Sequence, residues 1–122
     1  MTRTHIGKRT LQEVRDHYRH YLFEEYLPFW SRHGVDHERG GFFCTLGNDG
    51  TRLDDDKYMW FQGRGLWVYS SLARHFGDEE ALRIARKTAE FLLAHGRARE
   101  GWWVSGLGAD GRVAEGPTKR GY

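Results

Sequence analysis

The sequence predicts a mainly α-helical fold with short β-hairpins between the helices. Three segments, 11–27, 57–76 and 78–95, carry apolar residues at the spacing of amphipathic helices. Two glycine-rich segments, 40–53 and 101–113, instead combine paired aromatic residues with an Asp-Gly turn, which is typical of a β-hairpin. The predicted order along the chain is therefore helix, hairpin, helix, helix, hairpin.

The first predicted helix begins with a capping box. Thr10 is placed to cap the helix and Glu13 to bond back to the backbone of Thr10. Pro28 does not fit a helix interior, because it lacks an N–H group and its ring crowds the preceding turn. We therefore expect this helix to end or kink near Tyr26 or Leu27.

The other two helices also carry start and stop signals. Three acids, 54–56, precede the second helix and are predicted to cap it, because carboxylates accept hydrogen bonds from free N–H groups at a helix start. Gly77 is predicted to end that helix, and Asp78 to begin the next. We expect the third helix to end at His95 and Gly96 and to pair Glu79 with Arg83 on its surface.

The second helix carries the most informative face. Trp60, Arg64, Trp67 and Ser71 follow one another at steps of four, three and four, so they share one side of a helix. A guanidinium between two indoles, with the amide of Gln62 nearby, offers stacking surfaces and donors for a polyhydroxylated ligand. The alternative is a core helix whose arginine pairs with a buried acid, and spacing alone favours that reading.

The two predicted hairpins resemble each other. Each contains a glycine, two adjacent aromatic residues and a closing Asp-Gly, each follows a helix, and their centres lie about 60 residues apart. This pattern predicts a repeated helical unit with a β-hairpin at one end, and two such units leave apolar faces uncovered. The chain then stops at residues 116–122, a helix-start signal with no helix after it. We therefore expect the chain to be a truncated part of a longer protein.

Composition limits the classes of function. The 122 residues suit one small domain, 15% of them are aromatic, and a net charge of +2 without a basic cluster argues against a nucleic-acid partner. The only cysteine, Cys44, lies in an apolar run and is expected to be a small buried hydrophobe in a reducing compartment. The histidines lack the three or four matched ligands of a zinc site. With no signal-peptide pattern and no membrane span, we expect a cytoplasmic protein.

The motifs together resemble the N-acylglucosamine 2-epimerase family, which includes cellobiose 2-epimerases and mannose-type aldose–ketose isomerases. The resemblance rests on Lys57-x-x-Trp60-x-Gln62-Gly63-Arg64, preceded by Gly40-Gly41-Phe42 and Asp49-Gly50. It extends from the first helix and Trp30 to Gly101-Trp102-Trp103, so it covers nearly the whole chain.

This resemblance implies an (α/α)6 barrel whose sugar site lies where the loops and hairpins gather, with residues 1–122 as the N-terminal part of that single domain. It implies proton abstraction next to the sugar carbonyl, with Arg64 as the catalytic residue that stabilises the enolate oxygen. Trp60, Gln62, Trp67 and Tyr122 are the expected substrate-binding residues. The implied substrate is N-acetylglucosamine or N-acetylmannosamine. We expect no cofactor, no metal, and no membrane or nucleic-acid partner. A homodimer is compatible with these expectations.

The two histidines that serve the family as base and acid have no match here. His75 lies eleven residues beyond Arg64, about 16 Å along a helix, too far to reach the same substrate atom. We therefore expect the 122 residues alone to be inactive.

Two other classes of function stay open from the sequence. A glycoside hydrolase can share the barrel, but it needs two carboxylates beside the cleaved bond. The candidates, Asp36 and the acids at 54–56, are predicted to be loop and cap residues. The other class is a non-catalytic carbohydrate-binding module that is complete at this length. The apolar faces that two repeat units would leave exposed argue against it, because soluble monomers rarely expose large apolar surfaces.

Overall fold

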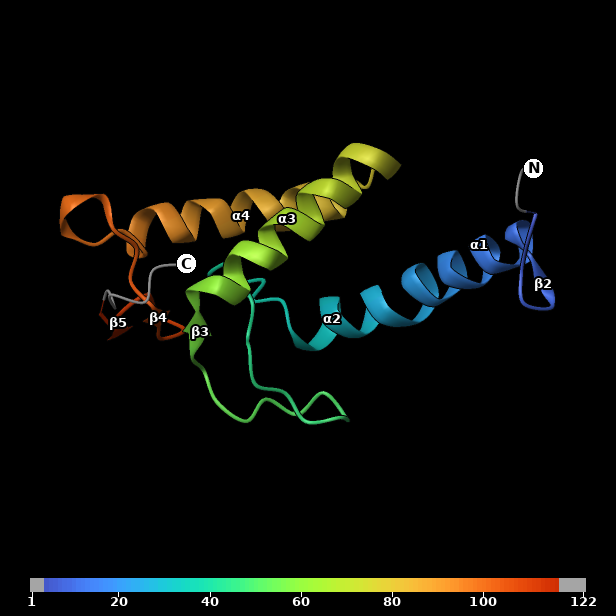
Figure 1. The fold of residues 1–122 in the computed structure, drawn as a ribbon. Coiled ribbons are helices and arrows are strands. Elements are labelled where there is room, and N and C mark those ends of the chain that lie inside the picture. The colour runs from blue at the N-terminus through green and yellow to red at the C-terminus, as the bar shows by residue number, and fades with distance from the viewer. Residues whose placement is uncertain (1–3, 117–122) are drawn as a thin grey trace. The chain divides into compact units, whose positions relative to one another are not determined.

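The computed structural model describes residues 4–116, which are mainly helical with two small β-sheets (Figure 1). The chain divides into two compact units, residues 1–32 and 33–122. Within the described residues, no helix is long and apolar enough to cross a membrane.

The first unit is a two-stranded sheet followed by a nearly continuous helix. Its elements are β1 (His5–Ile6), β2 (Arg9–Thr10), α1 (Leu11–His20), the π-helical segment η1 (Tyr21–Tyr26) and α2 (Leu27–His33). The predicted capping box is confirmed: the Thr10 hydroxyl accepts from the backbone N–H of Glu13 at 3.1 Å. The Glu13 carboxylate in turn accepts from the backbone N–H of Thr10 at 2.7 Å.

The first helix was predicted to end or kink near Tyr26 or Leu27; it does not end there, because helical structure continues to His33. The break expected at Pro28 takes the form of a wider turn just before it, in which the N–H of Leu27 bonds to the carbonyl of Leu22. Proline removes one hydrogen bond of an α-helix and crowds the carbonyl four residues back. A π-helical turn relieves both problems without ending the helix.

The second unit is built on two antiparallel helices, α3 (Met59–Phe76) and α4 (Glu79–His95), which pack side by side (Figure 1). The predicted cap residues between them are confirmed. Gly77 takes the left-handed conformation with φ of 66°, and Asp78 accepts from the N–H of Ala81 at 2.9 Å. The predicted partner of Arg83 is wrong: its guanidinium pairs with Glu80, one residue after Glu79.

The predicted cap of the second helix is also wrong. Residues 57 and 58 form strand β3 (Lys57–Tyr58), and α3 begins after Tyr58 with no side-chain cap. The acids lie in the preceding extended segment, where Asp55 pairs with Arg52 at 2.9 Å. The reason is tertiary, because β3 pairs with a strand about 50 residues later.

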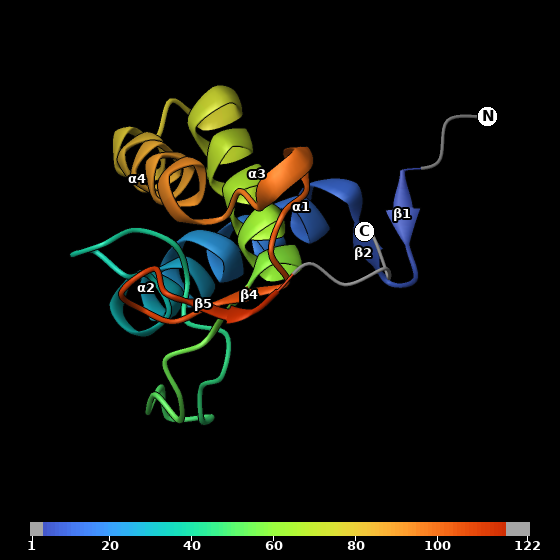
Figure 2. The same cartoon turned by 90° about the vertical axis from the view of Figure 1, so that its left-hand side faces the viewer.

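That pairing creates a three-stranded antiparallel sheet in the order β3-β4-β5, with β4 (Gly106–Leu107) between β3 and β5 (Val113–Glu115). The sheet lies at the end of the helix pair where α3 begins and α4 ends (Figures 1 and 2). The second predicted turn, 108–111, is confirmed, but the strands beside it lie later than predicted. Trp103, expected in a strand, instead forms an isolated bridge with Arg97.

The first predicted hairpin is not a ladder. Segment 40–53 contains the predicted turn, but only the isolated bridge between Leu46 and Arg52 pairs its two arms. A second bridge joins Phe42 to Val35. The turn residues were therefore read correctly, whereas the aromatic pair does not form a ladder with the other arm of the segment.

The internal repeat is visible in the hydrogen bonds of two loops of the second unit, the first loop at residues 34–53 and the second loop at residues 96–112. The N–H of Gly47 bonds to the carbonyl of Thr51, and 61 positions later the N–H of Gly108 bonds to that of Arg112. Three further backbone N–H bonds of the first loop have a counterpart in the second. The N–H of Gly50 bonds to the carbonyl of Gly47, as that of Gly111 bonds to Gly108, and the N–H of Phe43 bonds to the carbonyl of Gly34, as that of Val104 bonds to Gly96. The N–H of Thr51 bonds to the side chain of Asp49, as that of Arg112 bonds to Asp110.

The repeat extends to the residue beneath each turn. Gly50 and Gly111 both have φ of 87°. A Cβ on Gly50 would lie 2.4 Å from the ring of His33, and one on Gly111 would lie 2.5 Å from the ring of His95. Each turn therefore rests on the histidine that ends the helix before it, and only glycine fits there.

The two loops and α3 meet at one buried ammonium group. Lys57 has a side chain that is 0% exposed, and its Nζ lies 2.8 Å from both the Asp36 carboxylate and the carbonyl oxygen of Gly40. It also donates to Ala109 of the other loop at 3.3 Å and lies 4.2 Å from the ring centroid of Phe91 in α4. This one side chain thus joins both loops to the start of α3 and to α4.

Asp36 is ionised and hydrogen-bonded, so that it pairs with the Lys57 ammonium group. Its carboxylate also accepts from the backbone N–H groups of Glu38 at 3.1 Å and Arg39 at 2.9 Å. Burial alone would raise the pKa of Asp36, but these hydrogen bonds and the charge of Lys57 together hold it below its usual value. The carboxylate is therefore ionised at neutral pH.

An aromatic contact fastens the first loop to the middle of α3. Phe42, which is 2% exposed, stacks on Tyr69 with ring centroids 5.3 Å apart. The Phe42 ring also fills the space beside Gly65, where a Cβ would lie 2.3 Å from it. Gly65 is thus required for close approach of the loop, although glycine is a poor helix former.

We predict that Lys57→Met in the full-length protein lowers the free energy of unfolding by about 3–5 kcal/mol, because Asp36 is left buried without its counter-charge. Adding Asp36→Asn should recover part of this loss, since the amide oxygen still accepts from the loop N–H groups. Urea unfolding measures both. A double variant no more stable than Lys57→Met would show that the ion pair is not what the fold depends on.

A second prediction compares two glycines on the same helix. Gly65→Ala should cost about 1–3 kcal/mol, because its Cβ overlaps the Phe42 ring. Gly63→Ala is the matched control: nothing lies within 4 Å of its Cβ position, so alanine should stabilise the helix by up to about 1 kcal/mol. Equal shifts of the urea midpoint in the two variants would contradict the assigned packing.

Candidate functional site

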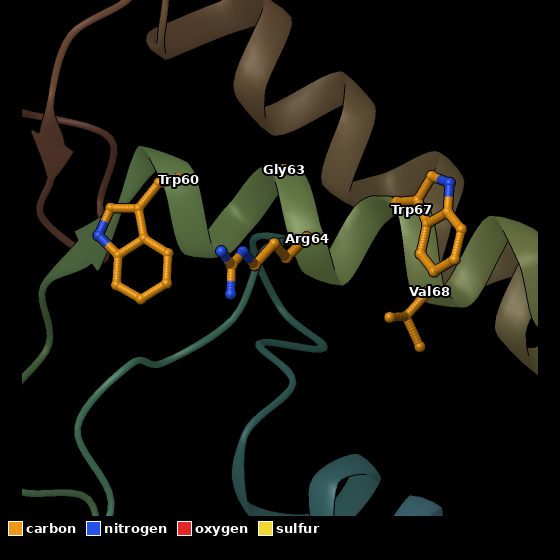
Figure 3. A pocket seen from close by; sticks show the side chains of 5 residues that line it. All are labelled: Trp60, Gly63, Arg64, Trp67 and Val68. Atoms are coloured by element: carbon orange, nitrogen blue, oxygen red, sulfur yellow. The ribbon is translucent and has the colours of Figure 1, made fainter. Parts of the chain in front are cut away.

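A pocket of about 550 Å³ runs along one side of α3 (Figure 3). The residues that line it are Trp60, Gly63, Arg64, Trp67 and Val68. The two indoles are 51% and 71% exposed, at positions 60 and 67 respectively. The structure therefore confirms that Trp60, Arg64 and Trp67 share one face, and within residues 4–116 that face is exposed. Ser71, expected on the same face, is half-buried and does not line the pocket.

Arg64 is held by an aromatic ring rather than by an acid. Its guanidinium carbon lies 5.2 Å from the ring centroid of Trp60. Side chains in a helix lean toward the N-terminus, so a residue reaches the one four positions before it (Figure 3). Among the ion pairs of residues 4–116, those of Arg15, Arg39 and Arg83 included, none involves Arg64. The buried-acid alternative therefore has no support in the described part of the chain.

Gln62 does not belong to the pocket. It is 0% exposed, and its Oε1 accepts from the backbone N–H of Phe42 at 2.7 Å while its Nε2 donates to the carbonyl of Phe42 at 2.8 Å. A Cβ on Gly41 would lie 2.7 Å from the same Oε1, so the loop approaches as closely as glycine permits. Gln62 lies two positions from both Trp60 and Arg64, which places it about 200° around the helix from each of them. The sequence therefore already indicated that Gln62 lies on another face of the helix. Gln62 thus holds the first loop against α3.

Cys44 lies beside this amide and is a poor nucleophile. Burial raises the pKa of the Cys44 thiol to about 11, although its sulfur accepts from the N–H of Tyr58 at 3.3 Å and from Gln62 at 3.4 Å. Reactive cysteines have lowered pKa values, so Cys44 is a packing residue, as its apolar surroundings in the sequence predict.

Other candidate residues lie apart from the pocket. His75 is exposed in the last turn of α3, three turns beyond Arg64. Tyr122, predicted to bind substrate, lies outside the described residues. Within 4–116 there is no group of three or more His, Cys, Asp or Glu side chains that could hold a metal ion. In chemical terms, the pocket offers one guanidinium group between two indole rings.

Comparison with known proteins identifies the fold and the family. The sequence profile of the family described as N-acylglucosamine 2-epimerase (GlcNAc 2-epimerase) matches residues 40–122, about two thirds of the chain. The chain belongs to this family.

Individual relatives agree with that assignment. Over 74 residues the chain is 46% identical to the N-acylglucosamine 2-epimerase of Mus musculus, a match that covers 58% of the chain and 18% of the relative. It is 34% identical over 70 residues to the cellobiose 2-epimerase of Bacteroides fragilis, covering 57% of the chain and 18% of that relative. The matched part of the chain thus spans about a fifth of the length of these epimerases.

Solved epimerase structures contain the same arrangement of elements. The structure of cellobiose 2-epimerase from Bacillus thermoamylovorans B4167 matches 86% of the chain with a TM-score of 0.77, covering 27% of that protein at 22% identity. The cellobiose 2-epimerase from Spirochaeta thermophila DSM 6192 matches 78% of the chain with a TM-score of 0.68, covering 23% of that protein at 25% identity. The helices and loops described above therefore form part of an epimerase fold.

We predict that native Cys44 reacts with iodoacetamide at pH 8 about 100-fold more slowly than a thiol of ordinary pKa 9.0, because a pKa of about 11 leaves correspondingly little thiolate. The rate should rise about tenfold per pH unit up to pH 10. Mass spectrometry of the labelled protein measures it, with the urea-unfolded protein as control. Equal rates in the two states would show that burial does not protect this thiol.

Proposed function

We propose that the full-length protein is a sugar 2-epimerase that acts on N-acylated hexosamines, with N-acetylglucosamine and N-acetylmannosamine as its substrate pair. The identity to the mouse N-acylglucosamine 2-epimerase, 46%, exceeds the 34% to the cellobiose 2-epimerase, which favours the acylated sugar. Aldose–ketose isomerisation is the nearest alternative reaction. Both begin by removing a proton from the carbon next to the sugar carbonyl.

We further propose that residues 1–122 are the N-terminal part of a single (α/α)6 barrel. The repeated loops support this, because a barrel of helical pairs needs the same connection at the same end of each pair. The three-stranded sheet and the buried Lys57 lie at the end where α3 begins, and Arg64 is on the second turn of that helix. The sugar site then lies beside the repeated loops.

The observation that carries the proposal is the guanidinium of Arg64, set in an open pocket between two indoles and free of any carboxylate partner among residues 4–116. Removal of the proton at C2 moves negative charge onto the carbonyl oxygen of the open-chain sugar. A fixed cation beside that oxygen stabilises the enolate more than the ground state, and so lowers the barrier.

The remaining pocket residues fit a sugar ligand. The indole of Trp67, 71% exposed, presents an apolar face on which the C–H side of a sugar can stack. Gln62 acts indirectly, since its amide is engaged with the first loop and fixes the turn of α3 that precedes Arg64. The proton acceptor and donor are assigned to residues beyond this chain, because no histidine of α3 reaches the pocket.

The hydrolase alternative is weaker at this site. Cleavage of a glycosidic bond needs two carboxylates on either side of it. None of the described residues that line the pocket is an Asp or a Glu. Two of the candidates named from the sequence have other partners: Asp36 is bound to buried Lys57, and Asp55 to Arg52. A purely carbohydrate-binding module remains the third candidate, distinguished by binding without proton exchange.

We predict that the full-length protein exchanges the C2 proton of N-acetylmannosamine for deuterium in deuterated water, and that Arg64→Ala lowers kcat about 100- to 1,000-fold by removing the oxyanion partner. Proton NMR of the sugar follows the exchange. Arg64→Lys, which keeps the charge without the planar fork, should recover only part of the rate.

Arg74→Ala is the matched control, since Arg74 is an exposed arginine in the last turn of the same helix. It should exchange at the rate of the unsubstituted protein. Full activity in a folded Arg64→Ala protein would remove Arg64 from the mechanism. No exchange with N-acetylmannosamine, mannose or cellobiose would overturn the epimerase proposal.

A further inference from the structure

We propose that Trp60 is a positioning residue for Arg64 rather than a platform for the sugar, and that Trp67 provides the stacking surface. This inference rests on the proposed function for its consequence in catalysis, but its geometric part stands on the structure alone. It divides two similar tryptophans on one helix face into two different roles.

The first step is the contact itself. The guanidinium carbon of Arg64 lies over the Trp60 ring at 5.2 Å from its centroid, within the range of a cation–π interaction. Figure 3 shows the Arg64 side chain directed back along α3 toward Trp60. No ion pair among residues 4–116 fixes the guanidinium, so the indole is the group that orients it.

The two indole rings differ in how much of their surface is free to contact a ligand. Trp60 carries the guanidinium over its face and contacts Phe61 edge-on, with ring centroids 5.8 Å apart and planes at 78°. It is 51% exposed, whereas Trp67, one turn beyond Arg64, is 71% exposed. A sugar that enters the pocket therefore meets the guanidinium on the Trp60 side and an open indole face on the Trp67 side.

The third step is the chemical consequence. A long arginine side chain is flexible, and an oxyanion partner acts only if it is already in place when charge develops. Loss of the ring should therefore lower kcat more than it changes KM. Loss of a stacking platform should do the opposite, because stacking binds ground state and transition state alike.

The experiment compares leucine and phenylalanine at position 60 in the full-length protein, with N-acetylmannosamine as substrate. Trp60→Leu removes the π face and should lower kcat about 5- to 30-fold with KM changed less than twofold. Trp60→Phe keeps a π face and should retain at least half of the activity. Trp67→Leu is the matched comparison and should raise KM with kcat nearly unchanged.

A second readout does not depend on activity. An indole face shields protons above it, so the Nε–H signal of Arg64 in a selectively labelled protein should lie upfield of a free arginine. The shift should disappear in Trp60→Leu and persist in Trp60→Phe, while backbone amide spectra report whether each variant is folded. Arg64→Lys identifies the signal by its loss.

The outcomes separate this inference from the proposed function. An unshifted Nε–H signal in the unsubstituted protein, or a Trp60→Leu protein with raised KM and unchanged kcat, would overturn the positioning role even if the protein is an epimerase. An inactive protein that shows the shift, lost on Trp60→Leu, would overturn the proposed reaction while supporting the assignment of Trp60.

Discussion

The second unit of the chain depends on the burial of one charged side chain. Lys57 is fully buried, and its ammonium group contacts a carboxylate of the first loop, carbonyl oxygens of both loops and an aromatic ring of α4. A buried charge left unpaired is costly, so these partners must all be present at once. Because Lys57 lies two residues before Met59, the first residue of α3, the same contacts also fix where the helix of Trp60 and Arg64 begins.

Gln62 and Gly65 extend this attachment along the opposite side of α3. The Gln62 amide closes on both backbone groups of Phe42, and Gly65 lets the Phe42 ring approach the helix backbone. One side of α3 is thus committed to the first loop. The other side carries the pocket lined by Arg64, so the packed side of α3 holds the helix that forms this pocket.

Much of this was predictable from the sequence where the physics is local. The capping box at Thr10, the left-handed Gly77, the cap at Asp78 and the two Asp-Gly turns all rest on interactions within a few residues. Two of the wrong predictions are local, namely the partner of Arg83 and the end of the first helix. The wrong prediction that matters most for the site involves a partner far away in sequence. The acids 54–56 are an acceptable cap, but strand pairing of Lys57 and Tyr58 with β4 takes precedence. Nothing near position 57 in the sequence indicates that pairing.

The candidate site shows the same division. Helical spacing placed Trp60, Arg64 and Trp67 on one face, and the pocket lies there. Helical spacing also separates Gln62 from that face. Its amide was nevertheless predicted to contact a ligand, because its actual partner, Phe42, lies 20 residues away and the sequence does not indicate that contact. The repeat was readable as two similar motifs, while the histidine beneath each turn became apparent only in three dimensions.

The most direct test of this account is a crystal structure of the full-length protein with an open-chain sugar analogue bound. We expect a terminal nitrogen of Arg64 within about 3 Å of the oxygen bound to C1 or C2, with the Trp60 ring still stacked on the guanidinium. A sugar bound away from α3, with Arg64 paired to a carboxylate instead, would contradict the account.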